Sequence, residues 1–174
     1  MNRNFKIIFS IILGLSIFFV LLKGLESTKK YSPLNTSNKI DLNIYFQSLF
    51  DEKEYSIKEL ADKKNFILIN IWSSWCLPCR EEHSYLMKLK KNNINLIGVN
   101  YKDNSNNAKV FIKEMGNPYT TILVDVDGTK SIELGAIGVP ETYLVDSSES
   151  KVLKKYIGPL DQKKFEEIIY ILKK

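Results

Sequence analysis

The sequence has few of the residue types that build metal centres or disulfide-rich scaffolds. It contains two cysteines and a single histidine, His83. A disulfide-rich scaffold needs several cysteine pairs distributed along the chain, whereas Cys76 and Cys79 are separated by two residues. A closed structural zinc site needs more ligands than two thiols and one imidazole supply. The cysteine and histidine content therefore excludes a multi-disulfide scaffold and argues against a structural zinc site.

The sequence also lacks a concentrated block of charge and any visible internal repeat. Its net charge is +5, and the basic residues are spread along the chain. Nucleic-acid-binding domains usually carry a dense basic patch, so we expect no nucleic-acid partner. A length of 174 residues suffices for one domain with a proper core and an additional segment.

A single long apolar run stands near the N-terminus, at residues 7–22. Arg3 and Lys6 precede it and Lys23 follows it, so the uncharged run is at the short end for a membrane-spanning helix. No small-residue cleavage pattern follows, which favours an uncleaved signal-anchor over residues 1–25. The basic residues before the run predict a cytoplasmic N-terminus and place everything after Lys23 outside the cytoplasm.

Two further regions follow this predicted anchor. Residues 26–39 are polar and aperiodic, which is typical of a linker, and residues 40–174 form the predicted domain. Within the domain, the apolar run Phe66–Trp72 predicts a central strand covered on both faces. A helix is expected to follow Cys79 and to end at about Lys91.

The other predicted elements also alternate between strands and helices. Residues 40–50 predict an edge strand or a loop, and Ser56 with Glu59 matches a capping box that opens a short helical turn. The rest are a strand over 94–100, a helix over Ser105–Met115, a strand over 121–124, a hairpin over 142–146 and 151–157, and a final helix capped by Asp161. This order predicts an α/β fold with a mixed central sheet and helices on both faces.

The cysteine pair lies between the predicted central strand and the helix after it. A thiol must be ionised to attack a disulfide, and the first turn of a helix stabilises a thiolate. We therefore expect Cys76 to be an exposed nucleophile and Cys79 to be a more buried resolving thiol. Trp75 beside them offers an apolar surface for a substrate. A structural metal half-site or a pair of thiols without a role is the disfavoured alternative.

A second candidate feature is Pro140, which stands just before the buried strand of the hairpin. Gly135 and Gly138 precede it. This arrangement indicates a special turn and suggests a cis peptide bond between Val139 and Pro140.

Together these residues resemble a known fold and, more closely, a known family. Residues 75–79 and the segment 138–140 resemble the thioredoxin fold, whose cis-proline loop packs against the active-site cysteines. Residues 79–83, 98–103, 116–119 and 140–146 further resemble the CcmG/DsbE family, the membrane-anchored thiol:disulfide interchange proteins of cytochrome c maturation. The resemblance covers residues 66–158 closely and both ends loosely.

The resemblance implies a periplasmic reductase without a cofactor beyond its own dithiol. Such a protein is reduced by a membrane thiol reductase and passes electrons to the disulfide of apocytochrome c, directly or through a partner thiol protein. It implies that Trp75, Val139 and Pro140 contact the substrate. Acidic residues near the cysteines are a mark of the family and map here onto Glu82 and Glu141, as candidate proton carriers for the buried thiol. An ordinary exposed helix glutamate is the alternative for Glu82.

Two residues bear on the competing functions. Thioredoxins proper carry a buried aspartate where this chain has Asn70, and an amide cannot accept a proton. A general periplasmic thioredoxin or a dithiol oxidase remains the closest alternative. A thioredoxin-fold copper chaperone would need a histidine as well, but that family spaces its cysteines differently, so we interpret His83 as a helix residue without a catalytic role.

Overall fold

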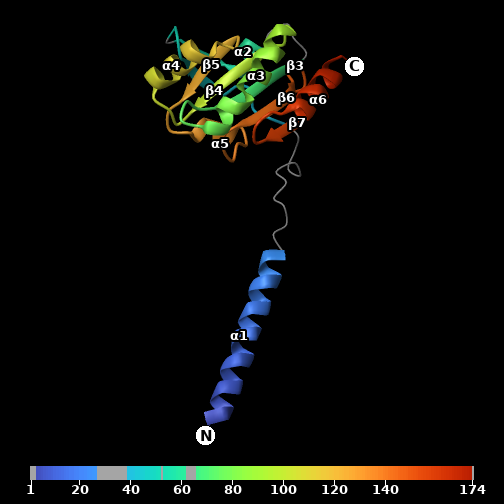
Figure 1. Ribbon diagram of the computed structural model, residues 1–174. Helices are drawn as coiled ribbons and strands as arrows, with labels where there is room; N and C mark the ends of the chain where they lie inside the picture. The colour runs from blue at the N-terminus through green and yellow to red at the C-terminus, as the bar shows by residue number, and fades with distance from the viewer. Residues whose placement is uncertain (1–2, 27–38, 52, 62–65, 174) are drawn as a thin grey trace. The chain divides into compact units, whose positions relative to one another are not determined.

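The computed structural model describes residues 3–26, 39–51, 53–61 and 66–173 (Figure 1). The chain divides into two compact units, Met1–Thr36 and Ser37–Lys174, which are considered separately. The linker predicted for residues 26–39 lies almost entirely outside the described residues.

The first unit contains helix α1 (Arg3–Glu26), in the region where an apolar helix was predicted. The described side chains between positions 7 and 21 are exposed. Among the described residues, no helix reaches the combination of length and apolar character expected of a membrane span. The helix itself is therefore confirmed, and its predicted role as an anchor is not.

The second unit is built on a mixed sheet. Within the described residues the sheet has seven strands, in the order β2-β1-β5-β4-β3-β6-β7. The strands are β1 (Tyr45–Ser48), β2 (Glu54–Ser56), β3 (Phe66–Trp72), β4 (Leu96–Tyr101), β5 (Thr121–Asp125), β6 (Glu141–Asp146) and β7 (Lys151–Ile157). β3, β4 and β5 are parallel to one another, and the other pairings are antiparallel. The predicted mixed sheet is confirmed.

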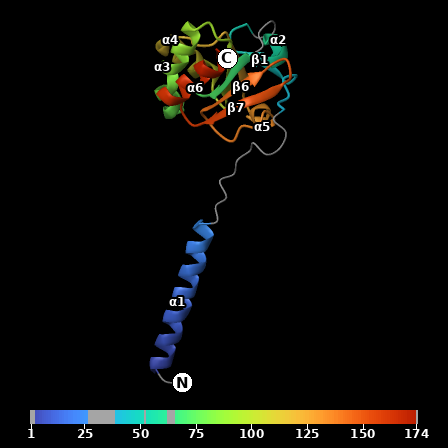
Figure 2. The same cartoon turned by 90° about the vertical axis from the view of Figure 1, so that its right-hand side faces the viewer.

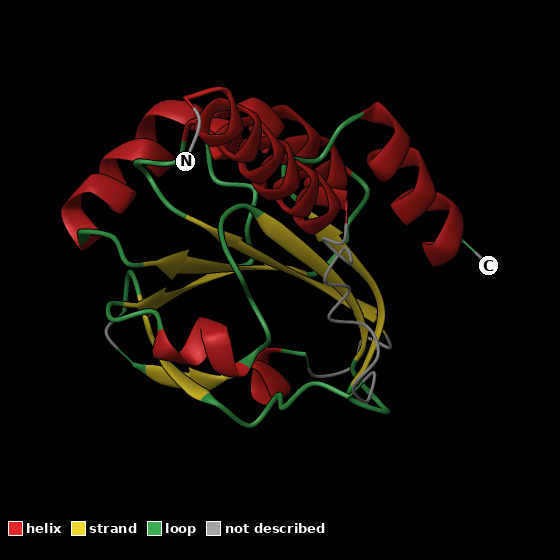
Figure 3. Cartoon of the chain, turned by 90° about the horizontal axis from the view of Figure 1, so that it is seen from below, coloured by secondary structure: helices red, strands yellow, loops and turns green. Residues whose placement is uncertain are grey.

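Helices cover both faces of this sheet, as predicted (Figure 3). The helices of this unit are α2 (Ile57–Leu60), α3 (Leu77–Lys91), α4 (Ser105–Met115), α5 (Thr129–Glu133) and α6 (Gln162–Leu172). One core cluster joins Leu68 and Trp72 of β3 to residues of α3, α4 and α6, and the other joins Ile67 and Ile69 to residues of α2 and to Leu134 beside α5. Since successive side chains of a strand point to opposite faces, the run of β3, which is apolar apart from Asn70, supplies both clusters.

Several predicted elements have the observed bounds, and others differ. β3 and α4 match their predicted ranges, and the capping box of Ser56 and Glu59 is present. The predicted hairpin is β6–β7, and α6 lies beside it (Figure 2), where Lys154 of β7 pairs with Glu167 at 2.9 Å. β1, however, is paired on both sides, and the edge strand beyond it is β2.

Two short elements, β2 and α5, were not predicted. β2 has three residues and α5 has five, which is too few to display a hydrophobic period. α5 begins after Gly128, whose φ of 80° is in the left-handed region. Both elements exist because the sheet supplies partners for them.

Candidate active site

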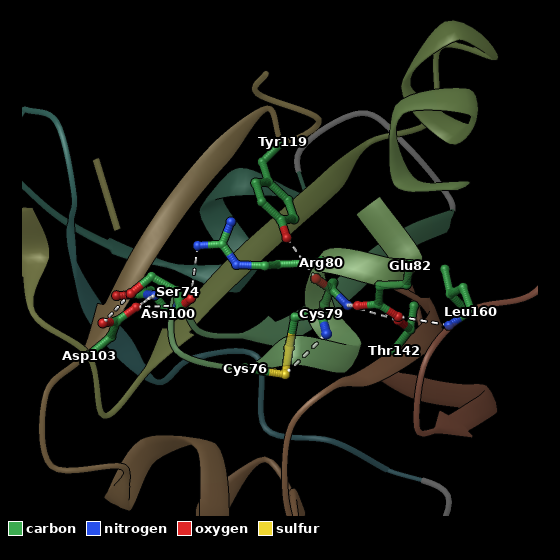
Figure 4. Close-up of a disulfide and its surroundings, with 11 residues drawn as sticks. Ser74, Cys76, Cys79, Arg80, Glu82, Asn100, Asp103, Tyr119, Thr142 and Leu160 are labelled. Carbon is green, nitrogen blue, oxygen red and sulfur yellow. Dashed lines mark hydrogen bonds between the residues drawn. A yellow bond between two sulfur atoms is a disulfide. The ribbon is translucent and has the colours of Figure 1, made fainter. Parts of the chain in front are cut away.

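The cysteine pair lies at the junction between β3 and α3 (Figure 4). Cys76 is the N-cap of α3, and its Sγ accepts the backbone N–H of Cys79 at 3.2 Å. The two cysteines form a disulfide, with 5.3 Å between their Cα atoms. Pro78 stands in the first turn, where a missing N–H costs no helical hydrogen bond. A thiolate at Cys76 would therefore find backbone N–H groups and the positive end of the helix dipole.

The prediction that Cys76 is exposed is wrong. Its exposed fraction is 4%, against 2% for Cys79. Both belong to the core cluster on the α3 face, against which Val139 packs, and this packing covers the sulfur that sequence position alone would leave open. The exposed residues are the neighbours Trp75 and Leu77. These two side chains therefore form the accessible apolar surface beside the disulfide.

Pro140 forms the second wall of the site. The Val139–Pro140 bond is cis, as the sequence suggested. Pro140 directly precedes β6, whose first residue, Glu141, pairs with Ile71 near the end of β3. Because β3 leads into the cysteine turn, this register brings the proline loop to the end of the sheet that carries Cys76.

The environment of Glu82 rules out the alternative given for this residue in the sequence analysis. It is fully buried and not an exposed helix glutamate. Its Oε2 accepts the backbone N–H of Leu160 at 2.8 Å, and its Oε1 accepts Asn70 Nδ2 at 2.9 Å. Burial raises the pKa of Glu82 to about 7, although these hydrogen bonds and the charge of Lys164 act in the opposite direction. The carboxyl can therefore gain or lose a proton near neutral pH, on the helix that carries both cysteines.

Glu141 is also buried, but it does not join Glu82. Its Oε2 forms an ion pair with Lys155 Nζ at 2.9 Å and accepts the Tyr143 hydroxyl at 2.9 Å, and its Oε1 accepts the N–H of Ile137 at 3.0 Å. Lys155 also donates to the carbonyl of Gly135 at 2.8 Å. Glu141 and Lys155 therefore hold the loop that leads to Pro140. That Glu141 carries a proton for the cysteines stays a prediction.

Asp103 is a site residue that the sequence did not indicate. Its carboxylate accepts the N–H of Ser74 at 2.6 Å, the Ser74 hydroxyl at 2.8 Å, Asn100 Nδ2 at 2.9 Å and the N–H of Asn104 at 2.8 Å. In the same segment, the carbonyl of Lys102 accepts the indole N–H of Trp75 at 2.9 Å. Residues 100–104 therefore fix the turn before Cys76. Their only signal in the sequence was the resemblance of residues 98–103 to a family.

We expect Asp103→Ala to destabilise the domain by about 1–3 kcal/mol, because the buried amide of Asn100 and the half-buried N–H and hydroxyl of Ser74 lose their acceptor. Urea unfolding measures this loss, and tryptophan fluorescence reports on the release of Trp75. Asp41→Ala is the matched control, since Asp41 is exposed and, within the described residues, accepts from its neighbour Asn43. An equally small effect of both variants would contradict the role given to Asp103.

His83 is buried on α3, four residues after Cys79. Its Nε2 lies 3.0 Å from the carbonyl oxygen of Gly116, and its ring packs edge-on against Phe111. Burial lowers the pKa of the imidazole, which favours the neutral form. In the described part of the chain, no group of three or more potential metal-ligating side chains gathers. His83 is thus a buried residue of α3, and the interpretation that it has no catalytic role stays a prediction.

Comparison with known proteins decides the family. Residues 42–170 match the family model described as Redoxin. The thiol:disulfide interchange protein DsbE of Pasteurella multocida is 40% identical over 123 residues, which cover 71% of this chain and 67% of that protein. The DsbE protein of Haemophilus influenzae is 36% identical over 142 residues, or 82% and 74% of the two chains. The chain belongs to the DsbE/CcmG family of thiol:disulfide interchange proteins.

The fold agrees with this assignment. A crystal structure of a DsbF homologue from Corynebacterium diphtheriae superimposes with a TM-score of 0.65 at 21% identity, over 76% of this chain and 85% of that one. The domain is thus thioredoxin-like, and the protein is a protein-disulfide oxidoreductase whose redox group is the pair Cys76 and Cys79.

Proposed function

We propose that this DsbE/CcmG-family protein works as a reductase in cytochrome c maturation. Its substrate is the disulfide of apocytochrome c or of a partner thiol protein, and a membrane thiol reductase supplies the electrons. The observation that carries the direction of electron flow is the buried carboxyl of Glu82, three residues after Cys79. Strong dithiol oxidants owe their potential to a stabilised thiolate in the reduced form. A carboxylate three residues after Cys79 adds negative charge near the dithiol, which disfavours a thiolate in the reduced form and so favours a reducing potential.

The exchange proceeds in two balanced steps. The Cys76 thiolate attacks one sulfur of the substrate disulfide, that bond breaks, and the other substrate sulfur leaves as a thiolate. The Cys79 thiol then gives its proton to the Glu82 carboxylate and attacks the Cys76 sulfur, so the second substrate sulfur leaves. The substrate gains two electrons, and its two sulfurs leave as thiolates that take one proton back from the Glu82 carboxyl and one from water. The protein is left with the disulfide between Cys76 and Cys79. The donor dithiol returns it to the reduced form.

Substrate contact comes from the accessible side chains around the disulfide. Trp75 is 59% exposed and held by its bond to the Lys102 carbonyl, so it presents a fixed apolar face. Val139 is half-buried, and the cis-Pro140 that follows it leaves the start of β6 beside the cysteines. An extended substrate segment would lie between these two walls.

The reduction potential tests the direction of electron flow. Equilibration with glutathione or a reference thioredoxin, followed by thiol alkylation, gives its value. We expect a value nearer to the roughly −270 mV of thioredoxin than to the roughly −120 mV of a dedicated oxidant. A value near the oxidant end would establish the dithiol oxidase instead.

We also propose that the domain faces the periplasm, tethered to the inner membrane by residues 1–25. The apolar run 7–22 and its basic N-terminal flank support this location. Protease treatment of spheroplasts, followed by alkaline carbonate extraction, tests both parts. Protection from the protease would contradict the periplasmic location, and release by carbonate would contradict the anchor.

A further inference from the structure

Three positions on adjacent strands form a row beneath α3. Asn70 of β3 pairs with Gly98 of β4 on one side and with Thr142 of β6 on the other. A Cβ at Gly98 would lie 2.9 Å from two ring carbons of Tyr119, so only glycine leaves room for that ring. Tyr119 also stacks on Trp72, with 5.6 Å between the ring centroids. The row thus places the Tyr119 hydroxyl next to Asn70.

A continuous chain of hydrogen bonds runs from this hydroxyl to Glu82 (Figure 4). The Tyr119 hydroxyl donates to Asn70 Oδ1 at 2.8 Å. Asn70 Nδ2 donates to Glu82 Oε1 at 2.9 Å and to Thr142 Oγ1 at 3.0 Å. All four side chains that these hydrogen bonds connect are buried. The oxygen of the Asn70 amide therefore accepts a hydrogen bond and its nitrogen donates two, which fixes the orientation of the amide.

We propose that Tyr119 and Asn70 are positioning residues that keep an N–H donor directed at Glu82 and so hold its carboxyl ready to ionise. This inference rests on the proposed role of Glu82 in thiol–disulfide exchange. A carboxylate can only accept hydrogen bonds, so it requires the Nδ2 side of the amide. An amide turned by 180° would direct Oδ1 at Glu82, and only a protonated Glu82 could donate to that oxygen.

The Tyr119 hydroxyl selects between these two orientations. With Glu82 ionised, the Tyr119 hydroxyl and the Asn70 amide each donate to an acceptor. With Glu82 protonated and the amide turned, Nδ2 can donate to the Tyr119 oxygen, but the buried phenol proton loses its acceptor. A buried donor without a partner costs about 1–3 kcal/mol, which corresponds to at least about a fivefold preference for the ionised carboxylate. Removal of the hydroxyl removes this preference.

The other groups around Glu82 do not act through the amide. Lys164 at the start of α6 attracts the carboxylate while donating to the carbonyls of Ile157 and Pro159. His83 on α3 is directed at Gly116, and the Cys79 thiol is the proton donor of the reaction itself. Burial raises the pKa of Tyr119 well above its usual range, so this phenol stays a neutral donor.

The test is a titration of Glu82 in the full-length protein, with ¹³C-labelled glutamate followed by NMR. We expect Tyr119→Phe to raise the proton affinity of the Glu82 carboxylate about tenfold. Gly98→Ala keeps the hydroxyl but forces the Tyr119 ring to move, and we expect a change in the same direction. Tyr143→Phe is the matched control, because the Tyr143 hydroxyl donates to the other buried carboxylate, Glu141. This variant should leave the titration of Glu82 unchanged.

A kinetic measurement separates this inference from the proposed role of Glu82. The rate at which Cys79 resolves a mixed disulfide is followed against pH in the same variants. We expect the midpoint of the pH–rate profile of Tyr119→Phe to move to higher pH by about one pH unit, which corresponds to the same tenfold change in proton affinity. If Glu82 titrates unchanged in both Tyr119→Phe and Gly98→Ala, the positioning role is wrong. If the titration moves and the rate profile does not, the positioning stands and the proton transfer by Glu82 is wrong.

Discussion

A Cys79→Ser variant should accumulate in cells as a mixed disulfide between Cys76 and the substrate protein. Cys76 retains its position as N-cap of α3 and can still attack, but no second thiol is left to displace the substrate. An intramolecular thiol at this distance acts at a very high effective concentration, so its removal should slow release by at least about a thousandfold. Non-reducing electrophoresis after acid quenching detects the adduct, and mass spectrometry of the released partner identifies it.

The identity of the trapped partner also tests the proposed pathway. Apocytochrome c or a thiol protein that serves it is the expected partner. Cys76→Ser is the matched control and should trap nothing, because Cys79 lies inside the first turn of α3 and lacks the N-cap position of Cys76 that stabilises an attacking thiolate. Adducts formed by Cys76→Ser instead would reverse the roles of the two cysteines. A collection of unrelated secreted proteins would point to a general periplasmic thioredoxin.

The stability of the domain should fall as the pH rises from about 5 to 8. The pKa of Glu82 rises from an ordinary 4.5 to about 7 on folding, because the carboxyl is buried. Between these values the folded state binds more protons than the unfolded state, so stability is highest below the lower value and is lost up to the upper one. This difference corresponds to about 3 kcal/mol. Urea unfolding at a series of pH values measures it.

Glu82→Gln is the control, since the amide has a similar volume and does not titrate. The fall in stability that the Glu82 carboxyl causes between these pH values should be absent from this variant. Burial lowers the pKa of His83, so that residue contributes a rise in stability with pH in both proteins, and the difference between them removes its effect. Parallel pH curves for the wild type and Glu82→Gln would show that the Glu82 carboxyl is not shifted by folding.

Short-range patterns in the sequence were sufficient for most of the fold. β3 was predicted from a run that is apolar apart from Asn70, and α4 from its apolar spacing and the Gly116 that ends it. The cis bond before Pro140 was suggested by the position of a proline ahead of a buried strand. Each of these signals lies within a few residues of the feature it describes. Elements as short as β2 and α5 carry no such signal.

The environment of the acidic residues could not be predicted in this way. The local sequence predicts that Glu82 lies on a helix. The hydrogen bonds that its buried carboxyl makes, however, come from Asn70, twelve positions earlier, and from Leu160, seventy-eight positions later. Glu141 resembles a partner of the cysteines in sequence, yet in the structure it pairs with Lys155 on β7. Base rates for exposed glutamates describe neither residue, because each is compensated by contacts distant in the chain.

The amino-acid sequence by itself determined where a thiol pair stands between a strand and a helix, and hence which chemistry the chain can perform. The tertiary structure alone decided how that pair is presented. Val139 packs against the cluster that buries Cys76, and Asp103 fixes the turn before it. The physical reason is that helix and strand formation depend on neighbouring residues, whereas burial and proton affinity depend on groups that only folding brings together.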